Sequence, residues 1–454
     1  MLSLAQLLYK EVADLPIISP HGHTDAAWFA YNEPFTDPTA LLITPDHYVY
    51  RMLYSQGISL TQLGMDANQR RGARAPDPAE VWQLFAAHYH LFRGTPTRIW
   101  LDHVFAEVFG IEEPLTAQTA SAYYERMTHQ LTLPEFRPRA LFERFNIELL
   151  ATTESPLDEL QSHSVLQADT WSGRVITTFR PDPVVDPDYE HFADNIATLG
   201  RLSGEDTTHF DGYLRALRER RAFFRAHGAT ATDHGHPTAR TANLAPADVA
   251  ALYSQALNQG LDAQKAELFR AHMLVEMATM SLEDGMVMQL HPGVYRNHNP
   301  WLFEQYGRDR GADIPQTTTY VEALKPLLDK YGNEPAFKLI LFTLDETTYA
   351  RELAPLAGHY PCLTLGPPWW FNDSPEGMRR FRRATTETAG FYNTAGFNDD
   401  TRAFLSIPAR HDLARRIDCG FLAQLVAEHA LDENEAVESA RQLAYGLAKR
   451  AYRL

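Results

Sequence analysis

The sequence predicts an α/β protein built on a (β/α)8 TIM barrel, with a helical insertion after the first strand. Eight apolar runs lack the period-two alternation of half-exposed strands, and several are rich in β-branched residues, so we expect strands buried on both faces. Helical stretches separate most of these runs, and such alternation indicates βαβ units and a parallel sheet. The length of 454 residues accommodates a barrel of about 250 residues and one insertion.

The expected elements can be followed along the chain. The strands are expected at residues 15–19, 147–152, 174–179, 229–232, 286–290, 338–344, 363–366 and 391–396. Helices between them are expected at 156–163, 248–257 and 263–280. An open doubly wound sheet would alternate in the same way, but it usually carries a glycine-rich phosphate-binding turn after its first strand. No such turn follows residues 15–19, and this favours the barrel.

The long gap between the first and second strands predicts the domain organisation. We divide the chain into an N-terminal helix with barrel strand 1 (1–23), a helical cap insertion (24–145), the remainder of the barrel (146–410) and C-terminal helices (411–454). Within the cap, residues 82–92 and 120–130 are expected to form amphipathic helices. Residues 70–78 carry Gly and Pro and are expected to form a loop.

The charge balance restricts the partners. With 41 basic and 58 acidic residues the net charge is -17, which argues against nucleic acid, because phosphate binding needs a basic face. An anionic substrate would therefore require arginines within the site itself.

The cellular location is expected to be the cytoplasm. No basic and apolar N-terminal signal and no run of about 18 apolar residues is visible, so no membrane contact is expected. Cys362 and Cys419 are too few for a zinc cluster, and we expect both to be reduced and buried.

Polar and aromatic residues follow most of the expected strands. In a (β/α)8 enzyme the working groups lie just beyond the carboxyl ends of the strands. In chain order the candidates are His21, His23, Arg180, Asp233, His291, Trp369, Trp370, Asp400 and Arg402. Their recurrence at the same topological position predicts a common site.

The histidines at 21 and 23 predict a metal site. Residues i and i+2 of an extended segment point to one side, so both imidazoles can reach one ion. His234 and His236 have the same spacing, but they lie in what looks like a turn. Asp400 is the expected third ligand, because the last strand of a closed barrel lies beside the first. Two histidines and a carboxylate leave positions open for substrate or water.

Several segments carry a family resemblance. They are Asp46-His47-Tyr48 with Arg51, Phe179-Arg180-Pro181-Asp182, Asp233-His234, His291 with Arg296-Asn297-His298-Asn299, Trp369-Trp370-Phe371-Asn372-Asp373, and Asp400-Thr401-Arg402-Ala403-Phe404-Leu405-Ser406. Together with the first histidine pair, they resemble the uronate isomerase (glucuronate isomerase) family of the amidohydrolase superfamily along nearly the whole chain. The last two segments are the most specific.

The resemblance implies an enzyme that converts D-glucuronate to D-fructuronate, and D-galacturonate to D-tagaturonate, by proton transfer from C2 to C1 through an enediol. It implies a mononuclear site, because the family lacks the bridging carbamylated lysine of binuclear relatives, and no lysine ends the fourth strand here. The implied roles are metal binding for His21, His23 and Asp400, proton transfer for Asp400, Tyr48 and Arg402, ring opening for Asp233 and His291, carboxylate binding for Arg180 and Arg402, and a sugar-binding wall for Trp369 and Trp370.

Several alternatives stay open. A mononuclear site on this scaffold could instead hydrolyse a lactone or amide, or decarboxylate a sugar acid, and a non-catalytic sugar-acid binding protein is a third possibility. The divalent metal is expected to be zinc, although manganese and iron use the same ligands. Only one of Trp369 and Trp370 is expected to face the site, because neighbours on an extended chain alternate in direction. A homo-oligomer is expected.

Overall fold

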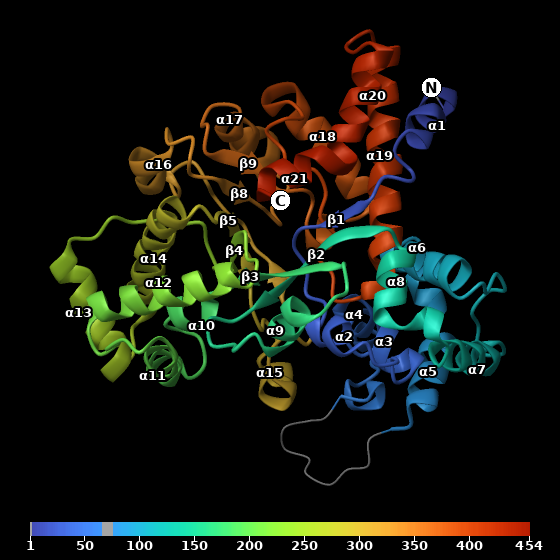
Figure 1. The fold of residues 1–454 in the computed structure, drawn as a ribbon, viewed down its shortest axis with the longest axis horizontal. Coiled ribbons are helices and arrows are strands. Elements are labelled where there is room, and N and C mark those ends of the chain that lie inside the picture. The colour runs from blue at the N-terminus through green and yellow to red at the C-terminus, as the bar shows by residue number, and fades with distance from the viewer. Residues whose placement is uncertain (1, 66–75) are drawn as a thin grey trace.

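The central sheet is a curled parallel sheet of seven strands (Figure 1). The computed structural model describes residues 2–65 and 76–454, so residues 70–75 of the expected loop lie outside the described residues. In spatial order the strands are β1 (Ile17–Ser19), β2 (Ile147–Glu154), β3 (Arg174–Phe179), β4 (Ala231–His234), β5 (Val287–Leu290), β8 (Leu339–Leu341) and β9 (Leu363–Leu365). Their order follows the chain, as in a (β/α)8 barrel. All seven correspond to expected strands.

The eighth expected strand, at 391–396, is wrong as a strand. Among the described residues this segment makes only an isolated parallel bridge between Leu365 and Thr394. Gly390 and Gly396 have φ of 68° and 73°, and such left-handed residues interrupt extended backbone at both ends of the segment. The segment still completes the (β/α)8 path, and the chain beyond it returns to the end of β1.

Helices cover the sheet. They are α9 (Gln161–Ala168), α10 (Asp182–Val185), α11 (Phe192–Ser203), α12 (Phe210–Ala226), α13 (Pro246–Asn258), α14 (Ala263–Asp284), α16 (Lys325–Tyr331), η5 (Tyr349–Leu353), α17 (Ala354–Ala357) and α18 (Pro375–Ala389). The predictions at 248–257 and 263–280 are confirmed by α13 and α14. The helix expected at 156–163 begins only at 161, because Asp158 accepts a hydrogen bond from the backbone N–H of Leu160, whose φ is 52°.

The segment between β1 and β2 is helical and lies to one side of the sheet (Figure 1). Its elements are α2 (Ala26–Tyr31), α3 (Pro38–Leu42), α4 (His47–Ser55), η1 (Thr61–Leu63), α5 (Pro78–Ala87), η2 (Tyr89–Phe92), α6 (Pro96–His103), η3 (Val104–Val108), α7 (Ala120–Leu131), η4 (Pro134–Phe136) and α8 (Pro138–Arg144). The helix at 120–130 is confirmed, whereas residues 82–92 are divided between α5 and η2. These elements share an apolar core around the buried Trp82, Phe85 and Phe105.

A long connection between β5 and β8, residues 291–338, reaches over the carboxyl ends of the strands. It contains the antiparallel pair β6 (Val294–Tyr295) and β7 (Ile314–Pro315), with α15 (Pro300–Tyr306) between them. We call it the β5–β8 connection.

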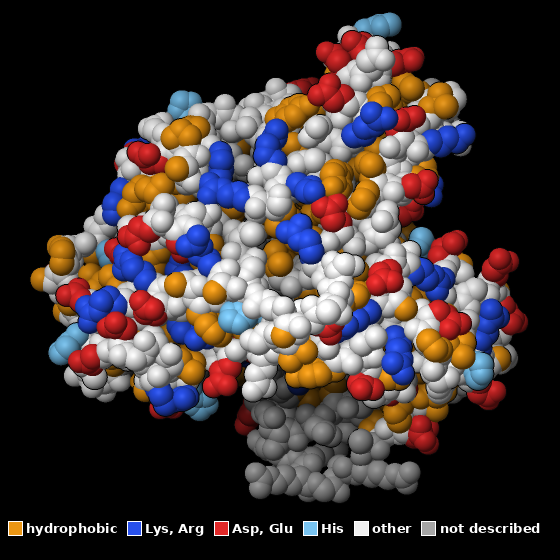
Figure 2. Space-filling view, viewed as in Figure 1, with side chains coloured by type: hydrophobic (Ala, Val, Ile, Leu, Met, Phe, Trp, Pro, Cys, Tyr) orange, Lys and Arg blue, Asp and Glu red, His pale blue; other side chains and the backbone are white. Residues whose placement is uncertain are grey.

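The two chain ends pack together. Helix α1 (Leu2–Lys10) lies against α19 (Ile407–Ala427), and Leu8 and Val12 share an apolar cluster with Cys419 and Leu422. The remaining elements are η6 (Trp370–Asn372), η7 (Phe404–Ser406), α20 (Glu433–Arg441), η8 (Gln442–Gly446) and α21 (Leu447–Tyr452). Across the described chain, the helices are too short or too polar to span a bilayer. Acidic and basic side chains are interspersed over the face shown in Figure 2.

Candidate active site

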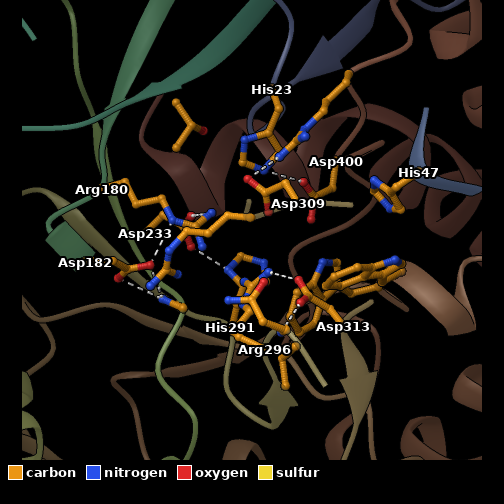
Figure 3. Close-up of a pocket in the computed structure, with 18 of the residues that line it drawn as sticks. His23, His47, Arg180, Asp182, Asp233, His291, Arg296, Asp309, Asp313 and Asp400 are labelled. Atoms are coloured by element: carbon orange, nitrogen blue, oxygen red, sulfur yellow. Dashed lines mark hydrogen bonds and ion pairs between the residues drawn. The ribbon is translucent and has the colours of Figure 1, made fainter. Parts of the chain in front are cut away.

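A cavity of about 690 Å³ opens at the carboxyl ends of the strands (Figure 3). All ten residues that the sequence nominated line it: His21, His23, Tyr48, Arg180, Asp233, His291, Trp369, Trp370, Asp400 and Arg402. Helix α4 and the β5–β8 connection supply further wall residues. Nine of the ten follow expected strands and therefore share one cavity, as a parallel barrel requires, whereas Tyr48 comes from α4.

The three expected metal ligands converge. The Oδ1 atom of Asp400 lies 3.5 Å from Nε2 of His21 and 3.1 Å from Nε2 of His23. Asp400 has φ of 39°, an uncommon left-handed conformation for a residue other than glycine, which turns its carboxylate back over the end of β1. The histidines come from the first strand and the carboxylate from the last segment, so the group spans the place where the barrel begins and ends.

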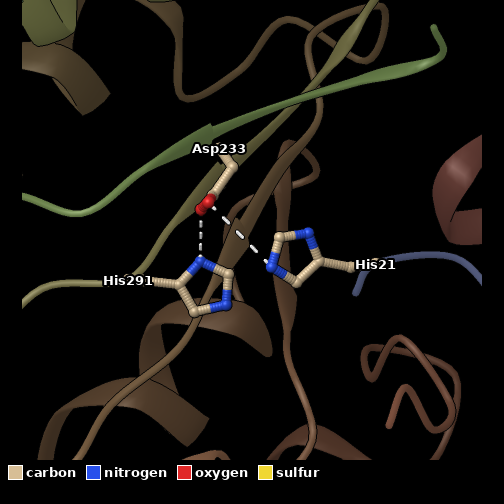
Figure 4. Close-up of side chains that lie close together, drawn as sticks. All are labelled: His21, Asp233 and His291. Atoms are coloured by element: carbon tan, nitrogen blue, oxygen red, sulfur yellow. Dashed lines mark hydrogen bonds and ion pairs between the residues drawn. The ribbon is translucent and has the colours of Figure 1, made fainter. Parts of the chain in front are cut away.

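A second group of donor atoms shares His21 with the first. The Nε2 atom of His21 lies 3.9 Å from Oδ2 of Asp233, whose Oδ1 lies 2.6 Å from Nδ1 of His291 (Figure 4). The rings of His21 and His291 stack with their centroids 5.0 Å apart. Because both groups use Nε2 of His21, they are alternative sites for a single ion.

The donor chemistry fits a divalent cation such as zinc, which binds neutral imidazole nitrogens and carboxylate oxygens. Burial lowers the pKa of His21 to about 4, so this ring is neutral at pH 7 and can offer a lone pair. Burial alone would raise the pKa of Asp400, but His21 and His23 hold it below its usual range. The competing pair, His234 and His236, belongs to neither donor group among the described residues, and Nε2 of His234 instead contacts the Thr232 hydroxyl at 3.0 Å.

Asp233 organises the cavity floor. Its Oδ2 atom lies 3.0 Å from Nη1 of Arg180, and Nε of Arg180 donates a hydrogen bond to Asp182 at 2.9 Å. Although burial opposes ionisation, Arg180 and His291 hold the pKa of Asp233 well below its usual range. An ionised carboxylate can only accept, so Nδ1 of His291 carries the proton. The Nε2 atom of His291 is buried and lacks a hydrogen-bond partner in the described chain.

Two further arginines reach the cavity from different elements. Nη2 of Arg402 lies 3.4 Å from Oδ2 of Asp309, and Nη1 of Arg296 donates to Asp313 at 2.8 Å. The guanidinium groups of Arg180 and Arg296 meet over Gly235, where a Cβ atom would lie 2.4 and 3.4 Å from them. A larger residue at this position would displace these side-chain ends, so glycine leaves room for both guanidinium groups.

Tyr48 reaches the cavity from the first turn of α4. Its hydroxyl donates to Oδ2 of Asp373 at 2.9 Å, and Nη1 of Arg410 donates to the same oxygen at 3.0 Å. Burial raises the pKa of Asp373 to about 7, and burial together with Asp373 raises that of Tyr48 well above its usual range. Tyr48 is therefore a neutral hydroxyl beside a carboxyl group that titrates near neutrality.

The expectation that only one tryptophan faces the site is wrong. Both line the cavity, because Trp370 has φ of 50° and begins η6, so the two side chains do not alternate as on an extended strand. The Trp369 ring meets that of His291 edge to face at 4.7 Å, and the guanidinium of Arg296 lies 5.6 Å from the Trp370 ring centre.

Several wall or supporting residues are not predicted from their position after a strand, and four of them are charged groups close to the residues described above. Asp309 and Asp313 lie on the β5–β8 connection, Asp373 lies behind Tyr48, and Glu154 ends β2. Burial raises the pKa of Glu154 to about 7. Glu154 does end a strand and could have been found, whereas the other three depend on how long loops fold.

Comparisons with known proteins identify the family. The family model described as glucuronate isomerase matches residues 2–452. A uronate isomerase from Sphingopyxis alaskensis is 63% identical over 455 aligned residues, covering 99% of this chain and 96% of that protein. A uronate isomerase from Xanthomonas axonopodis pv. citri is also 63% identical, covering 100% and 96%.

Solved structures agree over the same length. The crystal structure of glucuronate isomerase from Caulobacter crescentus superposes with a TM-score of 0.97 at 58% identity, covering 99% of this chain and 94% of that chain. The uronate isomerase structure from Thermotoga maritima gives a TM-score of 0.92 at 29% identity, covering 99% and 97%. Because one family model spans nearly the entire chain and full-length relatives share well over half of its residues, the chain belongs to the glucuronate isomerase family.

Proposed function

We propose that the chain isomerises D-glucuronate to D-fructuronate, and D-galacturonate to D-tagaturonate, by moving a proton from C2 to C1 through an enediol. The observation that carries this proposal is the convergence of His21, His23 and Asp400 with arginines such as Arg180 and Arg402 in one cavity. It supplies donors for one divalent cation and positive charge for an anionic sugar, within a chain whose net charge is -17. The family supports the same reaction, since its relatives are named uronate isomerases.

The metal would be held by His21, His23 and Asp400. A bound divalent cation would supply Lewis acidity to the oxygens at C1 and C2, where negative charge develops as the C2 proton leaves. We propose zinc, since two neutral imidazoles and one carboxylate are among its usual ligands.

Ring opening comes first, because uronates in water are mostly cyclic and only the open chain has a free carbonyl. We assign this step to His291 and Asp233. Asp233 fixes the proton on Nδ1 of His291, so Nε2 can accept the proton of the anomeric hydroxyl as the ring C–O bond breaks and then return it to the ring oxygen, which becomes a free hydroxyl. Asp233 stabilises the resulting imidazolium without taking up its proton.

Proton transfer between the carbon atoms follows. We assign abstraction of the C2 proton and its delivery to C1 to the Asp400 carboxylate, with Arg402 stabilising the negative oxygens of the enediolate. We assign to the Tyr48 hydroxyl the exchange of a proton with an enediol oxygen, and this hydroxyl donates a hydrogen bond to Asp373 at 2.9 Å. Trp369 and Trp370 would orient the sugar and exclude water.

Carboxylate recognition falls to Arg180 and Arg402. Guanidinium groups match carboxylates bidentately, and both side chains are partly open to the cavity, at 26% and 35% exposure. Because these guanidinium groups are partly exposed to the cavity, they can contact a substrate carboxylate without a large movement of the backbone.

The decisive experiment is proton NMR of D-glucuronate, and separately D-galacturonate, incubated with the purified metal-loaded enzyme in deuterated water. Ketose carrying deuterium at C1 is the expected result, because the transferred proton passes through an exchangeable group. Ketose without deuterium would keep the isomerase but indicate a shielded proton or a hydride shift. No ketose from either acid, with metal bound and the protein folded, would overturn the proposal.

We also propose a homo-oligomer in a reducing cytoplasm. Both cysteines, Cys362 and Cys419, are buried free thiols, and burial raises the pKa of each to about 12, which keeps them unreactive. Light scattering coupled to size-exclusion chromatography would measure the oligomeric state, and a mass equal to a single chain would contradict it.

A further inference from the structure

Asp309 is a carboxylate that the β5–β8 connection places in the cavity beside Arg402. Its Oδ2 atom lies 3.4 Å from Nη2 of Arg402, and the two side chains are 51% and 35% exposed. Against the effect of partial burial, Arg402, Arg296 and Arg180 hold the pKa of Asp309 below its usual range. Asp309 is thus an ionised carboxylate that lies near several arginines (Figure 3).

The pair formed by Arg402 and Asp309 is looser than those of the neighbouring arginines. The closer pairs are Arg180 with Asp182 and Asp233, at 2.9 and 3.0 Å, and Arg296 with Asp313, at 2.8 Å. Ion pairs that are open to water contribute little, about 0–1 kcal/mol, which corresponds to a factor of about one to five in affinity. Of these three arginines, Arg402 is therefore the one whose carboxylate partner is most easily replaced by another carboxylate.

The backbone that presents Asp309 is held in place. Asp309 has φ of 57° and lies between Gly307 and Gly311, whose φ values are 78° and 72°. The hydroxyl of the buried Tyr50 donates to the carbonyl of Asp309 at 2.6 Å. A Cβ atom on Gly311 would come within 2.9 Å of Cβ of Arg51, so the turn lies directly against α4. The backbone of Asp309 is therefore fixed against α4, whereas its side chain is 51% exposed.

We propose that Asp309 stands in for the substrate carboxylate on Arg402 in the free enzyme and is displaced when a sugar acid binds. The inference rests on the proposed function and adds a residue that tunes its selectivity. A uronate makes contacts along its whole length, and these offset the loss of the Asp309 pair. A small inorganic anion interacts with the site mainly through its charge, so it does not offset the loss of the Asp309 pair. Asp309 therefore weakens the binding of such anions to Arg402.

Replacement of Asp309 by Asn tests the proposal. Asparagine preserves the shape of the side chain and tolerates the left-handed backbone, so the turn should persist. At fixed low ionic strength, D309N should lower KM for D-glucuronate by about two- to fivefold with kcat unchanged. The inhibition constant of inorganic phosphate should fall by a similar factor. KM for D-glucuronamide, the neutral analogue, should not change.

The matched control is Asp188→Asn. Asp188 lines the same cavity and its side chain is 55% exposed, but it pairs with Arg270 and not with Arg402. D188N removes the same charge, so an equal decrease of KM in both variants would attribute the effect to the general field and overturn the proposal. A rise in KM for D309N, with phosphate inhibition unchanged, would also overturn it, because Asp309 would then be holding Arg402 in its productive orientation.

The role of Asp309 can be tested separately from the proposed isomerase activity. If the wild-type enzyme converted neither uronate, isothermal titration calorimetry with inorganic phosphate and with the dicarboxylate D-glucarate would still measure anion binding. Tighter binding of both by D309N than by the wild type and D188N supports the role of Asp309. Equal binding by all three proteins contradicts it, whatever the reaction is.

Discussion

Nδ1 of His291 donates a hydrogen bond to Oδ1 of Asp233 at 2.6 Å, and this contact determines which nitrogen of the ring is available for chemistry. The other nitrogen, Nε2, is the one without a partner in the described chain. Since Oδ2 of the same carboxylate meets Arg180 at 3.0 Å, a single aspartate links the ring proposed for proton transfer to the guanidinium proposed for anion binding.

Removal of this imidazole should abolish most of the activity. His291→Asn is expected to lower kcat/KM for D-glucuronate by about 10²- to 10⁴-fold, the usual contribution of a general acid–base group. Steady-state kinetics on metal-loaded enzyme would measure the loss. The control is His298→Asn, an exposed histidine on the same β5–β8 connection that does not line the cavity. Equal effects of the two substitutions would remove His291 from the mechanism.

Tyr48 and Asp373 should behave as a unit. Tyr48→Phe and Asp373→Asn are each expected to lower kcat by about 10- to 100-fold, because Asp373 acts by positioning the Tyr48 hydroxyl. The double variant should then be no worse than Tyr48→Phe alone. Combining Asp373→Asn with Tyr50→Phe provides the control, since Tyr50 lies on the same helix but donates to the Asp309 carbonyl. Additive losses for Tyr48 and Asp373 would show that they act separately.

The metal content should be one ion per chain, because both donor groups contain His21. Elemental analysis after dialysis against zinc should give about one equivalent for the wild type and much less for His23→Ala. His236→Ala, which alters a buried histidine outside both groups, should retain the metal. Loss of the metal from His291→Ala with retention in His23→Ala would place the ion in the second donor group instead.

Glu154 should make stability depend on pH. Its pKa is raised to about 7 in the folded chain from an ordinary value of 4.5, so the native state binds more protons than the unfolded state between these values. The free energy of unfolding therefore falls as the pH rises through this window. Glu154→Gln removes the titration, and its cost relative to wild type should be smaller at pH 8 than at pH 5 by about 2 kcal/mol.

Urea unfolding at the two pH values would measure this difference. Glu148→Gln is the matched control on the same strand. Although burial opposes it, Lys449 and Tyr445 lower the pKa of Glu148, so this group is ionised at both pH values and its substitution should cost the same at each. A pH-independent cost of Glu154→Gln would mean that Glu154 does not titrate in this range.

The fold could be predicted largely because buried parallel strands have a strong sequence signal. Residues 174–179 form β3 with the expected bounds, since an apolar, β-branched run covered on both faces has few other conformations. Residues 391–396 contain only one β-branched residue, and among the described residues they form a single bridge. The left-handed φ of Gly390 and Gly396 arises from local turns that a count of apolar residues does not register. Whether residues 24–145 form a separate cap domain remains a prediction.

The site was predictable wherever a residue follows a strand. His21, Asp233 and His291 lie together because parallel strands bring their carboxyl ends to one place. Asp309 follows no strand of the barrel. It reaches the cavity through a connection whose path depends on the hydrogen bond from Tyr50, a residue distant in the sequence. The spacing of residues in the sequence does not predict the path of this connection. The assignment of roles to the site residues remains a proposal.

Because the eighth segment of the barrel is barely paired, the candidate metal ligands could help to hold the first and last segments of the barrel together. In the described chain, β1 lies at one edge of the sheet and a single bridge lies beyond β9. A backbone hydrogen bond from His23 to Thr401, at 2.9 Å, joins the two edges at the cavity. An ion held by His23 and Asp400 would therefore cross-link two segments that come from opposite ends of the chain. Removal of the ion by a chelator should allow this contact to open locally before the sheet unfolds. Protease cleavage near residues 390–402 would therefore report release of the ion.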